Sequence, residues 1–235
     1  MNVALIAAGG RGERMMMEIP KQFIHVYDKP LIIYTLKAFQ EHPSIDAILV
    51  VCLDGWHDVL RACAKQFGIT KLKWIAAGGA SLQESVGNGL SSLHGSCAND
   101  DIVLIHDANR PLVTSDVISD SLAVATEKGC AVPIIPCEEV MLVSHDGLTS
   151  SECLDRSVVK RTQTPQAFRY GKILALYDKA LELKRNAIAP CDLMIQLGEA
   201  VFFSTGSKIN LKITTHEDLE ILKALLQAKA VHNHV

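Results

Sequence analysis

The chain has 235 residues, of which 49% are hydrophobic and 21% charged, and its formal net charge is -3. These proportions are typical of a folded domain with a closed core, and they exclude disordered and collagen-like chains. The slight acidic excess leaves no basic surface for a nucleic-acid backbone, so we expect no nucleic-acid partner. The seven cysteines form no C-x-x-C pair, which indicates buried free thiols rather than disulfides or zinc ligands.

The hydrophobic segments are too short to cross a membrane. The longest apolar runs cover residues 47–53 and 3–8, whereas a spanning helix needs about 20 apolar residues. The N-terminus reaches a glycine pair without a preceding basic segment, which argues against a signal peptide. We therefore expect a soluble cytoplasmic protein with no membrane partner.

Short apolar runs alternate with segments of helical periodicity. Strands are predicted at residues 3–8, 47–53, 72–76, 102–105 and 131–135, and helices from Pro30 onward and over 59–67, 81–94 and about 114–128. This alternation indicates right-handed βαβ units. We predict an α/β fold, a Rossmann-like three-layer sandwich with a mostly parallel twisted sheet, in a single domain over residues 1–235.

Residues 136–163 interrupt the alternation. A turn signal at His145-Asp146-Gly147 lies between short apolar pieces, which predicts a β-arm projecting from the sheet. Because such an arm cannot bury its own face, we expect a homodimer formed through it. Beyond the arm we predict a helix near 171–184, strands at 201–203 and 209–213, and a terminal helix capped by Thr215 and Asp218.

The turn after the first strand carries the strongest chemical signal. Its glycines, beginning with Gly9 and Gly10, let backbone N–H groups approach an anion. A P-loop would need a Lys-Ser/Thr pair, and a dinucleotide fingerprint would need a glycine where Met15 stands, so neither motif fits. Arg14 and Lys21 follow, and two such cations can neutralise the charge that builds up during phosphoryl or nucleotidyl transfer. The turn therefore predicts a nucleoside triphosphate site.

Two later turns and one lysine extend this site. Gly79, with Ser85 behind it, could admit a flat base against the backbone. Asp107 follows a buried strand, at the edge where ligands bind in open α/β sheets, although it could instead brace its turn by pairing with Arg110. Lys212 stands in an apolar segment, so its ammonium should reach an anion or solvent.

In order and spacing, these motifs resemble the cytidylyltransferases that act on sugar-alcohol phosphates. The matching segments are 8–15, Pro20-Lys21-Gln22, Gly78-Gly79, His106-Asp107-Ala108-x-Arg110-Pro111, Thr164-Pro165-Gln166 and Asn210-Leu211-Lys212. The resemblance implies transfer of CMP from CTP to a small polyol phosphate with release of pyrophosphate. It also implies Mg²⁺ bridging the triphosphate and a fold with a dimerising β-arm.

By this resemblance, Arg14 and Lys21 would stabilise the transition state at the α-phosphate. The CTP pocket would be lined by Ala8, Gly9, Gly10, Gly12, Gly79, Ser85, Asp107 and Ala108. The acceptor would be held by Arg110, Lys212 and, from a partner's arm, Arg156. The phosphate nucleophile is already anionic at neutral pH, so no general base is needed and His106 can be structural.

The acceptor itself is open between two members of the family. Leu82, Val140 and Cys191 replace an arginine and two acceptor-side threonines that are usual in the family. The segment around Asn210 and Trp56 favour ribitol 5-phosphate, the precursor of CDP-ribitol for cell-surface polymers. His106-Asp107-Ala108 favours 2-C-methyl-D-erythritol 4-phosphate, an isoprenoid precursor, which we take as the first expectation.

Two readings of other classes are also compatible with part of the sequence. A non-catalytic nucleotide-binding module would explain the replaced acceptor-side residues, but it would have no use for Arg14 and Lys21. A dinucleotide oxidoreductase would use an acidic residue at the end of the second strand, where Asp54 stands, but the missing third glycine argues against it.

Overall fold

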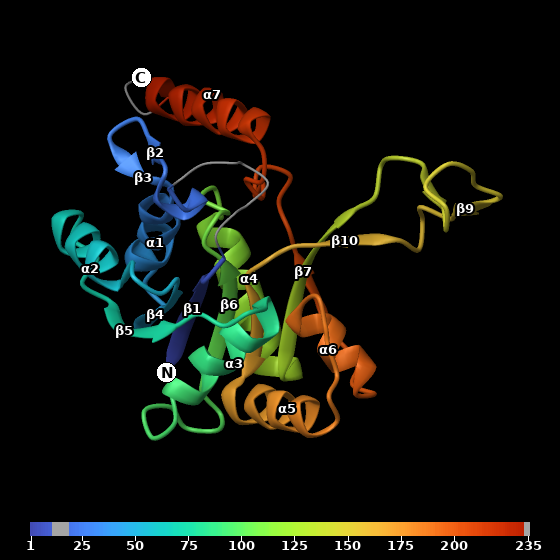
Figure 1. The fold of residues 1–235 in the computed structure, drawn as a ribbon, viewed down its shortest axis with the longest axis horizontal. Helices are drawn as coiled ribbons and strands as arrows, with labels where there is room; N and C mark the ends of the chain where they lie inside the picture. The colour runs from blue at the N-terminus through green and yellow to red at the C-terminus, as the bar shows by residue number, and fades with distance from the viewer. Residues whose placement is uncertain (11–18, 233–235) are drawn as a thin grey trace.

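The computed structural model describes the chain over residues 1–10 and 19–232, and it is built on one eight-stranded sheet. The strands of this sheet are β1 (Asn2–Ala8), β4 (Ala47–Cys52), β5 (Leu72–Ala77), β6 (Ile102–Asp107), β7 (Cys130–Pro136), β10 (Lys160–Thr162), β11 (Gln166–Arg169) and β12 (Phe203–Thr205). They lie in the order β10-β7-β11-β6-β1-β4-β5, with β12 beside β7 (Figure 1). Only β10 and β11 run antiparallel to their neighbours, so the predicted mostly parallel sheet is confirmed.

Helices cover both faces of this sheet. They are α1 (Leu31–Glu41), α2 (His57–Gln66), α3 (Leu82–Ser92), α4 (Ser115–Lys128), α5 (Tyr170–Glu182) and α6 (Pro190–Gln196). The short 3-10 helix η2 (Lys21–Phe23) precedes them, and α7 (His216–His232) packs in a separate small cluster with Val26 and Leu31. Buried side chains of α1, α2 and α4 form one core with the sheet, and those of α3, α5 and α6 form a second. Figure 1 shows α1 and α2 on one side of the sheet and α3, α5 and α6 on the other. The predicted three-layer α/β sandwich is therefore confirmed.

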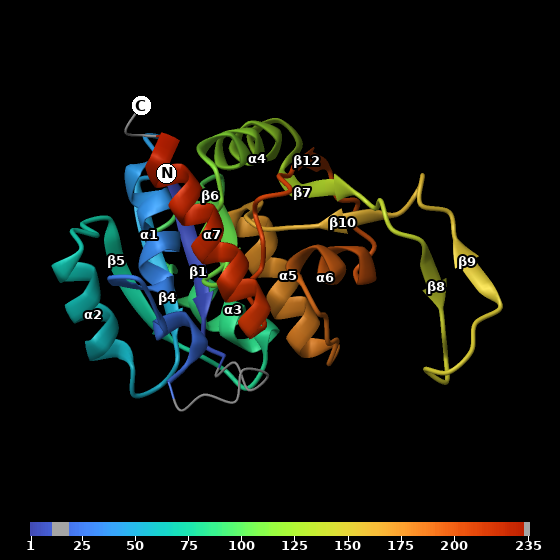
Figure 2. The same cartoon turned by 90° about the horizontal axis from the view of Figure 1, so that it is seen from above.

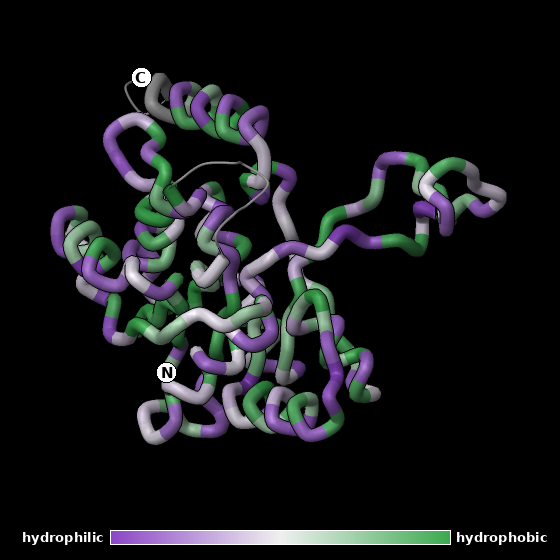
Figure 3. Tube along the Cα trace, in the orientation of Figure 1, coloured by the Kyte–Doolittle hydropathy of each residue, from purple (hydrophilic) through white to green (hydrophobic). Residues whose placement is uncertain are grey.

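The central strands are apolar on both faces because both faces are covered. In β1, Val3 and Leu5 belong to one core and Ala4 and Ile6 to the other, and all four are fully buried. Such strands read as continuous apolar runs rather than as alternating ones. Figure 3 shows these hydrophobic residues gathered in the sheet and the helix faces against it. Among the described residues, no helix is both long and apolar enough to cross a bilayer.

The helix ends follow from local sequence. Ser81 accepts a hydrogen bond from the Glu84 N–H (3.0 Å) at the start of α3. At the start of α7, Thr215 accepts from the Asp218 N–H (3.3 Å) while Asp218 accepts from the Thr215 N–H (2.9 Å). This reciprocal pair is the predicted capping box, with aspartate in place of glutamate. Gly129 ends α4 with a φ of 86°, a conformation that favours glycine.

Two predicted details are wrong. Residues 209–213 form an irregular segment instead of a strand, because Ile213 exchanges its N–H and C=O hydrogen bonds with Asn109 and pairs with no strand. Pro30 precedes α1 as its N-cap instead of opening its first turn. The sequence analysis also missed β11, which fills the place between β6 and β7, and the small hairpin of β2 (His25–Val26) and β3 (Lys29–Pro30).

The β-arm extends far from the sheet (Figures 1 and 2), and it includes the two-stranded sheet of β8 (Met141–Val143) and β9 (Glu152–Leu154). Its apolar side chains are largely uncovered, and the exposed fractions of Val140, Leu142, Leu148 and Val158 are 70%, 62%, 89% and 74%. At its tip, Asp146 accepts hydrogen bonds from the Leu148 and Thr149 N–H groups. The predicted projecting arm is confirmed. All seven cysteines are free thiols, as predicted, but only four are buried: Cys63 and Cys97 are partly buried, and Cys153 on this arm is exposed.

The close packing of α3 on the sheet gives a stability prediction. A Cβ added at Gly89 would lie 2.6 Å from Val51 Cγ2 and 2.9 Å from Leu5 Cδ1, whereas one at Gly87 would meet only Tyr177 at 3.5 Å. We expect Gly89→Ala to lower the free energy of unfolding by about 1–3 kcal/mol through overpacking. Gly87→Ala on the same helix should raise it by about 0.5–1 kcal/mol through helix propensity. Urea unfolding of both variants checks this, and a stabilised Gly89→Ala would contradict the packing.

Candidate functional site

The carboxyl ends of β1, β5 and β6 bring the three predicted turns to one edge of the sheet. Ala7 is the register partner of Asp107 on β6, and Ala8 is the partner of Cys52 on β4. The Ala108 N–H continues the ladder by donating to the Ala7 carbonyl oxygen (3.1 Å). Ligands of parallel sheets bind at this edge, so the topology gathers the candidate residues where the sequence predicted them.

A buried glutamine holds the glycine turn that follows β1. The Gln22 side chain is 2% exposed, and its Nε2 donates to the carbonyl oxygens of Ala8 (2.8 Å) and Gly10 (3.0 Å). Lys21 precedes it in η2. Gly12 and Arg14 lie outside the described residues. The sequence analysis quoted Gln22 as part of a motif but gave it no role; its polarity next to a buried phenylalanine was the available signal.

The second glycine turn packs directly against the first. A Cβ added at Gly9 would lie 3.1 Å from Gly78 Cα and 3.0 Å from Ser85 Oγ, so a larger residue would have to move the two turns apart by a few tenths of an ångström. The Gly79 N–H donates to Ser85 Oγ (2.9 Å), and Ser85 is buried. The structure thus brings Gly9, Gly79 and Ser85 together, although none of the three is among the residues that line the two cavities described below.

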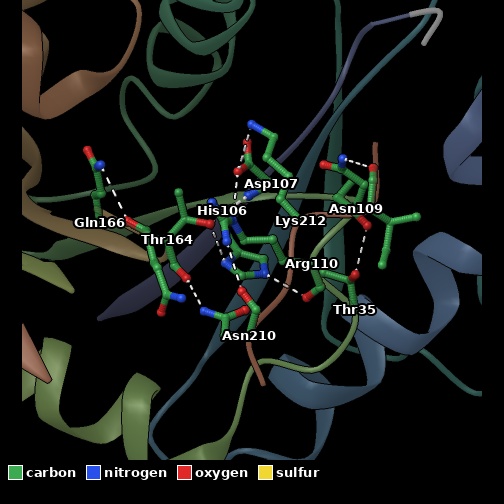
Figure 4. A network of polar contacts seen from close by, with 12 residues as sticks. Thr35, His106, Asp107, Asn109, Arg110, Thr164, Gln166, Asn210 and Lys212 are labelled. Carbon is green, nitrogen blue, oxygen red and sulfur yellow. Dashed lines mark hydrogen bonds and ion pairs between the residues drawn. The ribbon is translucent and has the colours of Figure 1, made fainter. Parts of the chain in front are cut away.

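An ion cluster centred on Asp107 lies at the end of β6 (Figure 4). Its Oδ2 is 3.0 Å from Arg110 Nε and 3.0 Å from Lys212 Nζ. Burial by itself would raise the pKa of this carboxyl, but Lys212 and Arg110 outweigh it and hold the pKa below its usual value. Asp107 is therefore the anionic partner that the sequence predicts for Lys212. The Asp107–Arg110 ion pair, which the sequence offers as an alternative role for Asp107, is also present.

A second network continues from this cluster into the fold (Figure 4). His106 is fully buried, with Nδ1 2.9 Å from Thr164 Oγ1 and Nε2 3.2 Å from the Arg110 carbonyl oxygen. Asn210 Nδ2 donates to the Thr164 carbonyl oxygen (2.8 Å), and Arg110 donates to the Asn210 carbonyl oxygen (2.8 Å). Three separate chain segments are thereby tied together, and no short sequence pattern predicts these contacts.

Two adjoining cavities open at this edge and share a wall. The glycine-turn cavity is lined by Ala7, Ala8, Gly10, Lys21, Gln22, Leu82, Asp107, Ala108, Asn109 and Lys212. The His106 cavity is lined by Ala7, Leu82, Ile105, His106, Asp107, Arg110, Thr162, Gln163, Thr164, Gln166, Ile188, Ala189, Pro190 and Lys212. Asp107 and Lys212 stand between the two, so two ligands bound side by side would both meet this pair.

Some expected site residues lie elsewhere. Arg156 is on the β-arm, where its guanidinium donates to the Glu138 carbonyl oxygen (3.3 Å), and it lines neither cavity. The arm itself extends away from the sheet (Figure 1). Val140 is also on the arm and exposed. Cys191 is buried, and its N–H donates to Gln166 Oε1 (3.0 Å). Leu82 lies in the wall that the two cavities share.

The described residues contain no cluster of three or more histidine, cysteine, aspartate or glutamate side chains able to hold a metal ion. Of the residues lining the two cavities, Asp107 is the sole carboxylate among those described, and its Oδ2 already faces two cations. Hard divalent cations need several oxygen ligands, so these residues by themselves do not make a resident metal site.

Comparison with known proteins gives consistent matches over nearly the whole chain. Residues 2–228 match the family model IspD, described as 2-C-methyl-D-erythritol 4-phosphate cytidylyltransferase. The ribitol-5-phosphate cytidylyltransferase of Lacticaseibacillus paracasei is 41% identical, covering 97% of this chain and 99% of the relative. The 2-C-methyl-D-erythritol 4-phosphate cytidylyltransferase of Clostridium botulinum is 35% identical, covering 96% and 97%.

The fold agrees with solved structures. The crystal structure of 2-C-methyl-D-erythritol 4-phosphate cytidylyltransferase from Thermus thermophilus superimposes with a TM-score of 0.77 at 26% identity, covering 95% of this chain and 98% of that one. The match extends over nearly the whole length of both chains.

The buried histidine gives a prediction about pH. Burial lowers the pKa of His106 to about 4, from 6.5. Between these values the unfolded chain binds a proton that the folded ring excludes, so the free energy of unfolding falls as pH falls from 6.5 to 4. Over this pH range, His106 accounts for a decrease in the free energy of unfolding on the order of 3 kcal/mol.

The measurement is urea unfolding of the natural chain and of His106→Gln at several pH values across this window. The variant should show a shallower decline in the free energy of unfolding with acidity. Equal declines in the two proteins would show that His106 is not the group excluded from protonation.

Proposed function

The chain belongs to the IspD family of cytidylyltransferases, and we propose that its acceptor is ribitol 5-phosphate, which receives the CMP moiety of CTP. The supporting observation is the greater identity to a ribitol-5-phosphate enzyme, 41%, than to two methylerythritol-phosphate enzymes, 35% and 37%. The first expectation from the sequence, 2-C-methyl-D-erythritol 4-phosphate, is therefore replaced by the alternative, and with it the expected place in isoprenoid synthesis. Family membership also removes the dinucleotide oxidoreductase and leaves no support for a non-catalytic module.

The two adjoining cavities suit a transfer between two anionic substrates. CTP would occupy the glycine-turn cavity, near Lys21 and the backbone of Ala8 and Gly10. The acceptor would occupy the His106 cavity, beside Arg110. An oxygen of the acceptor phosphate attacks the α-phosphorus, the bond from that phosphorus to the bridging oxygen breaks, and pyrophosphate leaves with the electron pair. Lys212, in the shared wall, lies where both substrates bring their charge.

Mg²⁺ would enter with CTP as part of the substrate. A triphosphate supplies several hard oxygen ligands itself, whereas the described cavity residues supply one carboxylate that is already paired. Charge on the phosphate oxygens would thus be neutralised partly by this ion and partly by Lys21 and, by the family resemblance, Arg14.

The acceptor is tested by pyrophosphate release from CTP and Mg²⁺ with a panel of polyol phosphates. We expect kcat/KM for ribitol 5-phosphate to exceed that for 2-C-methyl-D-erythritol 4-phosphate by at least about 100-fold, since a site that pairs substrate hydroxyls discriminates strongly. The product should be CDP-ribitol by mass. A higher kcat/KM for the methylerythritol substrate would restore the first expectation.

We also propose a homodimer in which the β-arm of each chain completes the site of the other. The arm carries exposed apolar residues, Val140, Leu142 and Val158 among them, and such side chains are normally covered by a partner. Arg156 lies on this arm and lines neither cavity of its own chain. A partner's arm would bring that cation to the acceptor phosphate.

Mixing two defective variants tests the shared site. Lys21→Ala should lower kcat by on the order of 100-fold through loss of a preorganised cation. Arg156→Ala should raise KM for the acceptor and leave KM for CTP nearly unchanged. In a mixed dimer one site carries both substitutions and the other neither.

After mild denaturation and refolding together, random pairing should restore about a quarter of the natural activity at limiting acceptor, because half of the dimers are mixed and have one intact site each. Each variant refolded alone is the control. No recovery from a mixture shown to contain mixed dimers would place Lys21 and Arg156 in the same chain's site.

We place the reaction in the cytoplasm. All seven cysteines are free thiols, which suits a reducing compartment.

A further inference from the structure

We propose that His106 is a positioning residue that holds the acceptor side of the site through one fixed tautomer, with the hydrogen on Nε2. The inference rests on the proposed function for its kinetic consequence, but its structural part depends only on hydrogen bonds within the chain. The ring nitrogens of His106 contact no charged group of the ion cluster, and His106 does not line the glycine-turn cavity. It acts on two residues of the His106 cavity, Arg110 and Thr164.

The direction of the hydrogen bonds determines the tautomer. The Arg110 carbonyl oxygen can only accept, so His106 Nε2, 3.2 Å away, must carry the hydrogen. In the neutral ring Nδ1 then accepts, and the Thr164 hydroxyl at 2.9 Å donates to it. Thr164 Oγ1 in turn accepts from the Asp107 N–H (3.2 Å). The four groups form one chain in which each donor meets an acceptor.

This series of hydrogen bonds links Asp107 and Arg110, the two ends of one turn, through Thr164 in a separate segment of the chain. It begins at the Asp107 N–H and returns to the Arg110 carbonyl oxygen, with Thr164 between them (Figure 4). His106 is fully buried, and its ring packs edge-on against Phe39 with ring centroids 5.0 Å apart. Packing therefore fixes the ring plane, and the hydrogen bonds fix the positions of Arg110 and Thr164.

The triphosphate side is held by different contacts. Ala108 is tied to Ala7 through its N–H (3.1 Å), and its carbonyl oxygen accepts from Thr35 Oγ1 (2.7 Å). The glycine turn is held by Gln22. None of these bonds passes through His106, so removing its ring nitrogens should disturb the acceptor cavity and leave CTP binding nearly intact.

The first test reads the tautomer directly, without any assay. Nitrogen-15 spectra of the ring nitrogens of histidine at neutral pH distinguish protonated from unprotonated Nδ1 and Nε2, and comparison with His106→Gln identifies the signals of His106. We expect a neutral ring with the hydrogen on Nε2. A hydrogen on Nδ1, or on both nitrogens, would overturn the proposal whatever the enzyme's acceptor is.

The second test separates the two substrates. His106→Phe keeps the ring against Phe39 and removes both hydrogen bonds, whereas His106→Gln keeps an amide donor for the Arg110 carbonyl oxygen. We expect KM for the acceptor to rise about tenfold in His106→Phe and less in His106→Gln, with KM for CTP within about twofold. His42→Gln is the matched control, at another buried histidine, whose ring nitrogens contact Ser119 Oγ and the Ser44 N–H; it should change neither KM.

Thermal unfolding of each variant establishes that the proteins compared are folded. An unchanged acceptor KM in folded His106→Phe, or an equal rise in both KM values, would show that His106 only fills space. Absence of transfer by the natural chain to any polyol phosphate would refute the proposed function, and the tautomer would then still decide the structural part of this inference.

Discussion

The site depends on one partly enclosed carboxylate between two cations. The Asp107 side chain is 13% exposed, and a charge so placed is unfavourable unless it is paired. Arg110 and Lys212 pair with it, and they come from the end of β6 and from a segment about a hundred residues later. The cluster therefore joins distant parts of the chain, and it holds two positive groups in place before any substrate arrives.

The surrounding contacts make this arrangement rigid on the protein side. The Arg110 guanidinium has two partners, the Asp107 carboxylate and the Asn210 carbonyl oxygen. Lys212 has one partner among the described residues, Asp107, and the Lys212 side chain is 39% exposed. A fixed arginine and a more accessible lysine suit different tasks, since arginine holds a set orientation and lysine acts as a mobile point charge. Charge neutralisation and alignment are the main protein contributions to phosphoryl transfer.

The β-arm differs from the rest of the molecule in that its apolar side chains are not buried in a core. The sheet and its helices bury two extensive cores, while the arm leaves apolar side chains such as Leu148 exposed. A projecting two-stranded ribbon has little to stabilise it alone. The proposed dimer would resolve this, and it would at the same time explain why Arg156 lines neither cavity of its own chain.

The sequence by itself determined the α/β fold, because buried strands, glycine turns and capping residues are local signals of a few residues each. It also placed Gly9, Gly79 and Asp107 at one edge, since the carboxyl ends of parallel strands necessarily meet there. It failed where contacts are long-range. That residues 209–213 are no strand, and that His106, Thr164 and Asn210 form one network, depends on segments that only the tertiary fold brings together, and hydrogen bonds between such segments leave no periodic pattern in the chain.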